Sequence, residues 1–180
     1  MTRFHASDEF SGADGIIDYT LTTDSAPLTA LRDHWMQARG SHVMPAHADL
    51  RPAAMKPALP FLMILEAING GEDFKLRLIG TAIVKAAGID ETGRLLSTAL
   101  HQRLATRMRD VCRHVMRRQS GMRGFAPLVL RDDVDFLAHE GIWLPLGADR
   151  RHADMVACAT VFATMDRLRL EQVIKPMEKA

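Results

Sequence analysis

The stretch 74–94 constrains the fold more than any other, because its hydrophobic period changes once and glycines punctuate it. Leu76 and Leu78 alternate with basic residues, which is the period-2 pattern of a strand with one buried face. From Thr81 the apolar spacing becomes that of a short helix, and Gly88 is placed to end it. We therefore expect a strand that leads directly into short helices.

The segments around this stretch predict the rest of a sheet. The nearly continuous apolar run from Phe61 to Ile68 is typical of a central strand covered on both faces. Asn69-Gly70-Gly71 favours a hairpin, so the first two strands should pair antiparallel. Further on we expect a long helix and three more strands, at 104–118, 123–131, 138–146 and 155–163, with Gly121 ending the helix. Five antiparallel strands with helices inserted after the second make an α+β domain.

The ends of the chain are predicted to differ from this domain. Residues 1–23 are poor in periodic apolar residues and are expected to form a flexible arm, and 166–180 a tail or short helix. A flanking helix is expected over 24–40, before the domain at 41–165, with Trp35 on its apolar side. Trp35 either covers the core edge of its own domain or anchors a second subunit.

A family resemblance rests on F-K-L-R-L-I-G-T-A-I-V, Gly88 and E-T-G-R, with Met44-Pro45 and Leu59-Pro60 upstream. Over about 28–162 the chain resembles PAS domains, in particular a bacterial branch in which one PAS domain makes up nearly the whole protein. The resemblance implies a PAS fold and a regulatory role in signal transduction through protein–protein interaction, with a homodimer and an unknown signalling partner.

The resemblance also implies a pocket between the inner face of the sheet and the helices that follow the second strand. Its predicted lining is Leu76, Leu78, Ile83, Leu96, Met108, Val111, Cys112, Val115, Leu128 and Trp143. Most of these side chains are apolar, so two alternatives stand: a cavity for a small apolar ligand, or a solid core.

Cofactor sites find little support in the sequence. Some PAS domains hold haem through a histidine on the long helix, where this chain has Cys112 and His114, but His114 falls on the basic side of the helix. Flavin photochemistry requires a cysteine-containing motif after the second strand, and 81–94 has no cysteine. His42 and His47 are the closest histidine pair, but they lie in a proline-rich loop, so we expect no metal site.

Catalytic motifs are missing as well: the sequence has no GxSxG, no GxxxxGK[ST] and no HExxH, and we expect no enzyme activity. The N-terminus lacks the pattern of a secretory signal, and the longest apolar run, 59–65, is too short to cross a bilayer. We therefore expect a cytoplasmic protein. The two cysteines form no CxxC pair and suggest neither a disulfide framework nor a zinc site.

The long helix carries one strongly basic face, although the formal net charge of the 180 residues is only +1. Together with Trp35, the residues predicted to form an interaction surface are Arg103, Arg107, Arg113, Arg117 and Arg118. Arginine binds carboxylates and phosphates, so the face suits an acidic protein or, as a lesser alternative, a nucleic acid. It also fits an ordinary solvated helix face, and no helix-turn-helix pattern accompanies it.

Overall fold

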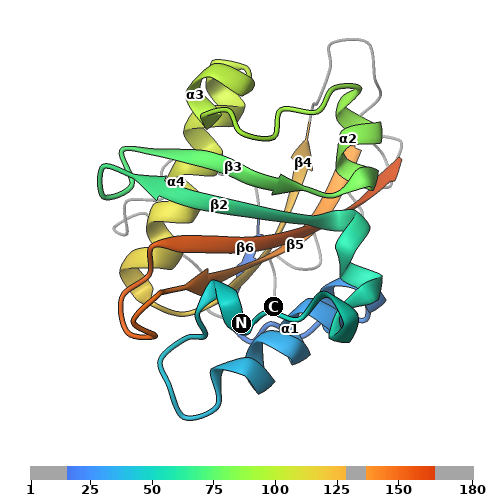
Figure 1. Ribbon diagram of the computed structural model, residues 1–180. Helices are drawn as coiled ribbons and strands as arrows, with labels where there is room; N and C mark the ends of the chain where they lie inside the picture. The colour runs from blue at the N-terminus through green and yellow to red at the C-terminus, as the bar shows by residue number, and fades with distance from the viewer. Residues whose placement is uncertain (1–15, 129–136, 165–180) are drawn as a thin grey trace.

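The computed structural model describes residues 16–128 and 137–164. Its elements, shown in Figure 1, are β1 (Ile16–Asp18), α1 (Ala26–Arg39), the short 3-10 helices η1 (His47–Asp49), η2 (Pro52–Ala54) and η3 (Lys56–Phe61), β2 (Leu62–Ile68), β3 (Asp73–Ile79), α2 (Thr81–Ala87), α3 (Leu96–Ala99), α4 (Gln102–Arg118), β4 (Met122–Leu128), β5 (Leu137–Leu146) and β6 (Met155–Thr164). The tail expected at 166–180, and the arm as far as residue 15, lie outside the described residues.

The six strands form one antiparallel sheet in the order β1-β4-β5-β6-β2-β3. The α+β class, the antiparallel sheet and the helices after the second predicted strand are confirmed. The additional strand is β1, within the segment expected to be a flexible arm: Ile16 to Asp18 pair with Phe125 to Arg123 of β4. The sequence gives little sign of it because a three-residue edge strand is too short to show a period.

Local backbone conformation explains where two helices end. Gly88 follows α2 in the left-handed region, with φ of 77°, and ends the helix where the sequence analysis placed its end. Helix α4 instead ends at Gln119, with φ of 53°, two residues before the expected Gly121. Gly121 is needed for a different reason: a Cβ there would lie 2.5 Å from the Cδ2 atom of Leu144.

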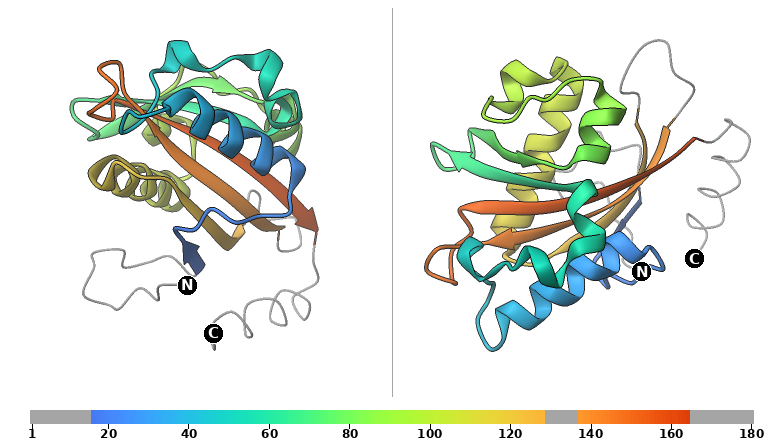
Figure 2. Two further views of the ribbon diagram at one scale, coloured as in Figure 1. Left: turned by 90° about the horizontal axis from the view of Figure 1, so that it is seen from below. Right: turned by 45° about the vertical axis from the view of Figure 1, so that its right-hand side comes forward.

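Helices cover both faces of the sheet, with α1 on one side and α4 on the other (Figure 2). Strands β2, β5 and β6 send alternate side chains to each face, which produces two separate apolar clusters. The α1-side cluster consists of Leu21, Leu28, Leu31, Trp35, Met44, Met55, Ala58, Leu62, Ile64, Ile142, Leu144, Leu146, Ala157 and Ala159. The α4-side cluster consists of Met63, Leu65, Phe74, Leu76, Leu96, Val111, Cys112, Val115, Met122, Trp143, Val156 and Cys158.

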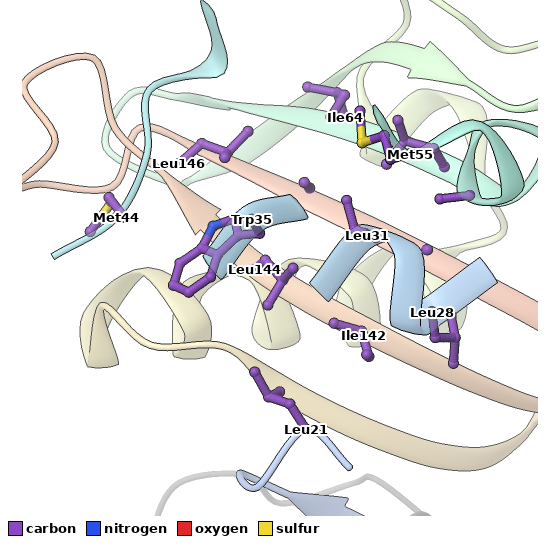
Figure 3. Packing of buried hydrophobic residues seen from close by; sticks show 14 residues of the cluster. Leu21, Leu28, Leu31, Trp35, Met44, Met55, Ile64, Ile142, Leu144 and Leu146 are labelled. Atoms are coloured by element: carbon purple, nitrogen blue, oxygen red, sulfur yellow. The ribbon is translucent and has the colours of Figure 1, made fainter. Parts of the chain in front are cut away.

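Trp35 belongs to the α1-side cluster of its own chain (Figure 3). Its side chain is only 3% exposed, and its indole Nε1 donates a hydrogen bond to the carbonyl oxygen of Pro145 at 2.8 Å. Leu28 and Leu31 precede it at helical spacing on the same buried side of α1. The intramolecular alternative is the one that the structure shows, and Trp35 is not part of an exposed interaction surface.

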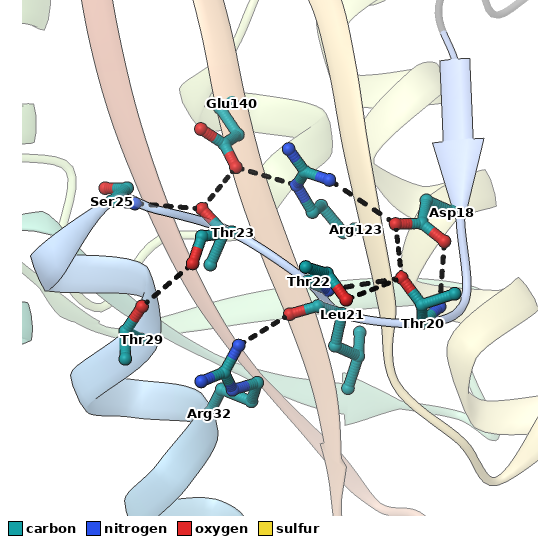
Figure 4. Close-up of polar contacts among 10 residues, drawn as sticks. All are labelled: Asp18, Thr20, Leu21, Thr22, Thr23, Ser25, Thr29, Arg32, Arg123 and Glu140. Carbon is teal, nitrogen blue, oxygen red and sulfur yellow. Dashed lines mark hydrogen bonds and ion pairs between the residues drawn. The ribbon is translucent and has the colours of Figure 1, made fainter. Parts of the chain in front are cut away.

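The segment between β1 and α1 is held by a chain of polar contacts (Figure 4). Arg123 of β4 contacts Glu140 of β5 through Nε at 2.7 Å and Asp18 of β1 through a terminal nitrogen at 3.4 Å. The hydroxyl of Thr23 donates to the same Glu140 carboxylate at 2.6 Å, and Leu21 is buried in the α1-side cluster. These contacts explain why residues 16–23 are ordered against the sheet.

Candidate functional site

The structure brings most of the predicted pocket lining together under α4. Six of the ten side chains are buried in the α4-side cluster: Leu76, Leu96, Val111, Cys112, Val115 and Trp143. Ile83 and Met108 are partly buried against it. Leu78 is not part of it, and the side chain of Leu128 lies outside the described side chains.

Leu78 is misplaced by the sequence pattern because β3 contains an irregularity. The register with β2 pairs Leu65 with Leu76 but Ile64 with Leu78, so Arg77 is an extra residue on β3. A one-residue slip moves every later side chain to the opposite face of the sheet. Leu78 is consequently 41% exposed, and Ile79 packs against the α4-side cluster in its place.

The floor of the site is a row of side chains across the central strands. Register pairs Met122 with Trp143, Trp143 with Cys158, and Cys158 with Met63, and all four belong to the α4-side cluster. Sequence analysis named only Trp143 among them. Met63 and Cys158 lie within predicted strands, whereas Met122 lies just before the strand predicted at 123–131. Without the pairing register, neither face of these strands could be assigned to α4.

Two residues away from this row along each strand, at the next position on the same face, the floor consists of two glycines and a threonine. Gly141 of β5 pairs with Gly124 of β4 on one side and with Thr160 of β6 on the other. The indole of Trp143 lies over this gap: a Cβ at position 141 would be 2.7 Å from Cη2 and 3.1 Å from Cζ3 of Trp143. The absence of a side chain at Gly141 therefore leaves the room that the Trp143 ring occupies.

The two thiols in the cluster are neutral side chains in an apolar setting. Burial raises the pKa of Cys112 well above its usual value, and the nearby Cys158 raises it further. Burial likewise raises the pKa of Cys158 to about 12, although the thiol contacts the Thr160 hydroxyl at 3.3 Å. A neutral thiol is a poor nucleophile and a poor metal ligand, so both cysteines act here as small apolar groups.

The three histidines weighed above are not part of the α4-side cluster. Nε2 of His114, weighed above as a haem ligand, lies 2.8 Å from the hydroxyl of Tyr19 in the β1–α1 segment rather than in the α4-side cluster. His42 and His47 are both exposed. Over residues 16–128 and 137–164, no three histidine, cysteine or acidic side chains are grouped as a metal site would need.

Several arginines predicted to form an interaction surface are used within the fold. Arg113 donates to the carbonyl oxygens of Gly71 and Glu72, at 2.6 and 2.7 Å, and so ties α4 to the β2–β3 turn. The guanidinium of Arg118 stacks on the ring of Tyr19, 4.2 Å from its centre. Both contacts use the side chain to hold the domain together, which sequence spacing did not reveal.

The other arginines of that surface differ in exposure. Arg103 and Arg117 are exposed on α4, and Arg107 is partly buried. Arg118 is exposed as well, although it stacks on Tyr19. The exposed arginines are the part of the predicted surface that a partner could reach directly.

Within the described part of the chain, no helix is both long and apolar enough to span a bilayer.

Comparison with known proteins adds a family to this geometry. A family model described as "PAS domain" matches residues 23–161. No curated protein matches the chain.

Several solved structures resemble this one at low identity. They include a domain of an HTR-like protein from Haloarcula marismortui ATCC 43049 (13% identity, TM-score 0.43, covering 57% of this chain and 98% of that one), the PAS domain of BvgS from Bordetella pertussis (12%, 0.41, 65% and 87%) and an RNA-binding light-oxygen-voltage receptor (15%, 0.47, 93% and 44%).

Proposed function

Because the chain belongs to the PAS domain family, we propose that it is a regulatory protein that binds a signalling partner under the control of a small apolar ligand. The family model covers 23–161, which confirms the resemblance to PAS domains, while the bacterial single-domain branch stays a prediction. PAS domains are signal-sensing and regulatory domains in general, whereas the ligand and the partner are particular to each protein. In this proposal the protein acts as a homodimer in the bacterial cytoplasm.

The observation that carries the proposal is the α4-side cluster. Eight of the ten predicted lining residues are buried in it or packed against it, between α4 and the central strands. Its members are apolar or carry sulfur, and Thr160 supplies a hydroxyl at the floor. Such a lining suits an uncharged small molecule, because a charged one would lose its hydration without gaining a partner.

The partner surface in this proposal is the exposed basic part of α4. Arg103 and Arg117 are exposed on α4, and other side chains of the same helix are buried in the cluster. A shift of α4 would therefore also move these two arginines. Guanidinium groups pair well with carboxylates, and an acidic protein surface is the partner that this chemistry favours. A nucleic acid is less favoured, since no helix-turn-helix pattern accompanies the basic face.

The test pairs a binding surface with a ligand site. The wild-type protein should capture a partner from an extract of the source cells, and Arg117→Glu should abolish this capture. Lys85→Glu makes the same charge change at an exposed position of α2 and should leave capture intact. Val111→Trp should fill the proposed ligand site in the α4-side cluster. Partner capture by this variant should then no longer respond to added small molecules from the extract. A folded wild-type protein that neither forms dimers nor captures a partner would contradict the proposal.

A further inference from the structure

The α4-side cluster has an unusual feature where the Trp143 ring packs on the sheet, over Gly141; we call this place the seat of the ring. Glycines are uncommon within strands, and they often mark a place where another group approaches the backbone closely. Here Gly124 and Gly141 are direct register partners on neighbouring strands, next to Thr160. The two glycines leave this part of the sheet without side chains, beside the hydroxyl of Thr160.

Trp143 fills this area from its own strand. A Cβ at Gly141 would approach the six-membered ring of Trp143 to 2.7 Å and the Thr160 hydroxyl oxygen to 3.2 Å. The ring reaches back two residues along β5, so a change of its side-chain torsions would take it off Gly141. The displaced ring would then need volume elsewhere in the cluster.

We propose that the small ligand of this protein is an uncharged, planar aromatic molecule of about the size of indole, and that it binds on the Gly124–Gly141 floor in place of the Trp143 ring. This inference rests on the proposed function and gives its ligand a chemical class. The size and flatness of the ligand follow from the ring that now occupies the seat. Its lack of charge follows from the surrounding methionine, cysteine and valine side chains.

Displacement of the ring has a structural consequence on the α4 side. Val111, Cys112 and Val115 of α4 belong to the same buried cluster as Trp143. Close packing leaves little unfilled space, so the displaced indole must take volume now used by these side chains. Ligand binding would therefore shift α4, which carries the exposed arginines of the proposed partner surface.

The experiment uses the two tryptophans as separate reporters. Each apolar cluster holds one, Trp35 on the α1 side and Trp143 on the α4 side. Protein labelled with 5-fluorotryptophan should give two fluorine resonances, and Trp35→Phe assigns them. Indole is the probe, indole-3-acetate the charged control and cyclohexanol the non-planar control.

The expected result is a saturable shift of the Trp143 resonance with indole, no shift at Trp35, and a rise in the melting temperature. Neither control compound should produce these effects. Gly141→Ala should move the Trp143 resonance without any ligand, because the new methyl group meets the ring, and should abolish the response to indole. Trp143→Ala should bind indole more tightly than the wild type, since its seat is already open.

Two results would overturn the inference. One is an unmoved Trp143 resonance in the wild type, whether or not Trp143→Ala binds indole; if that variant does not fold, the wild-type titration decides alone. The other is an equal shift at both tryptophans, which indicates non-specific binding. Intact partner capture without an indole response refutes this inference only, whereas an indole response without partner capture refutes the proposed function only.

Discussion

Replacing Arg123 with methionine should test how the β1–α1 segment is held to the sheet. Arg123 lies between the carboxylates of Glu140, at 2.7 Å, and Asp18, at 3.4 Å. All three side chains are between 10% and 18% exposed. The substitution keeps most of the volume but leaves two nearly buried carboxylates without their cation.

The expected cost follows from this partial burial. Removing one partner of a fully buried ion pair costs about 3–5 kcal/mol, and a hydrogen bond to a charged group contributes about 1.5–3 kcal/mol. Because some solvent reaches these side chains, we expect Arg123→Met to lower the free energy of unfolding by about 2–3 kcal/mol. Arg77→Met is the matched control, since Arg77 pairs with Glu66 at 3.6 Å with both side chains much more exposed, and it should cost less than about 1 kcal/mol.

The assay is urea denaturation at several pH values. Burial, the largest single influence, raises the pKa of Asp18, but hydrogen bonds from Thr20 and Arg123 together lower it below its usual value. A carboxylate with a lowered pKa in the folded state stabilises the protein above its ordinary pKa and loses this effect as the pH falls. The difference between wild type and Arg123→Met should therefore be full near neutral pH and shrink below about pH 4. A cost at neutral pH equal to that of Arg77→Met would refute this explanation.

Three further predictions concern single positions. Leu76→Ala should lower the free energy of unfolding by about 2–5 kcal/mol, but Leu78→Ala by only about 0.5 kcal/mol, when both are measured by urea denaturation; similar costs would mean that the two side chains share a face. Hydrogen bonds from Arg150, and to a smaller extent from the backbone N–H of Ala46, lower the pKa of Asp49 to about 2. A carbonyl NMR titration of Arg150→Met should therefore find that pKa raised toward about 3.9, and an unchanged midpoint would rule out Arg150 as the main cause. Gly80→Ala should destabilise the domain by at least about 1–3 kcal/mol in the same denaturation assay, because its Cβ would lie 2.4 Å from the carbonyl oxygen of Pro60; a neutral variant would mean that η3 can move away easily.

Much of the fold could be predicted from local patterns. The hairpin at 69–71 and the end of α2 at Gly88 depend on backbone conformations that glycine and asparagine favour. Both features could therefore be predicted from the residue types alone. The strands and the long helix follow from hydrophobic period. These features are confirmed because each is decided by residues close together in the chain.

The remaining features depend on pairing between distant segments. Strand β1 forms because Ile16 to Asp18 pair with the edge of β4. The sequence of this short segment does not indicate which strand it pairs with. The exposure of Leu78 follows from one extra residue in β3 relative to β2. Likewise, spacing on a helical wheel placed Arg113 on an exposed face, but the long side chain reaches the β2–β3 turn.

The site was predicted as a set of apolar positions but not as a shape. The resemblance to PAS domains named residues such as Val111 and Trp143, and the structure brings these two into one cluster. The glycine floor under the indole, in contrast, appears only when β4, β5 and β6 are aligned side by side. A pairing register is information that one sequence does not contain.

The central claim is that the α4-side cluster holds a small ligand, and native mass spectrometry tests it most directly. Wild type and Val111→Trp would be purified from the same host and measured under gentle conditions, with circular dichroism to show that both are folded. We predict a wild-type dimer that carries a small non-covalent adduct and a variant that carries none, because the larger side chain occupies the site. The same adduct on both proteins, or on neither after incubation with an extract of the source cells, would contradict the claim.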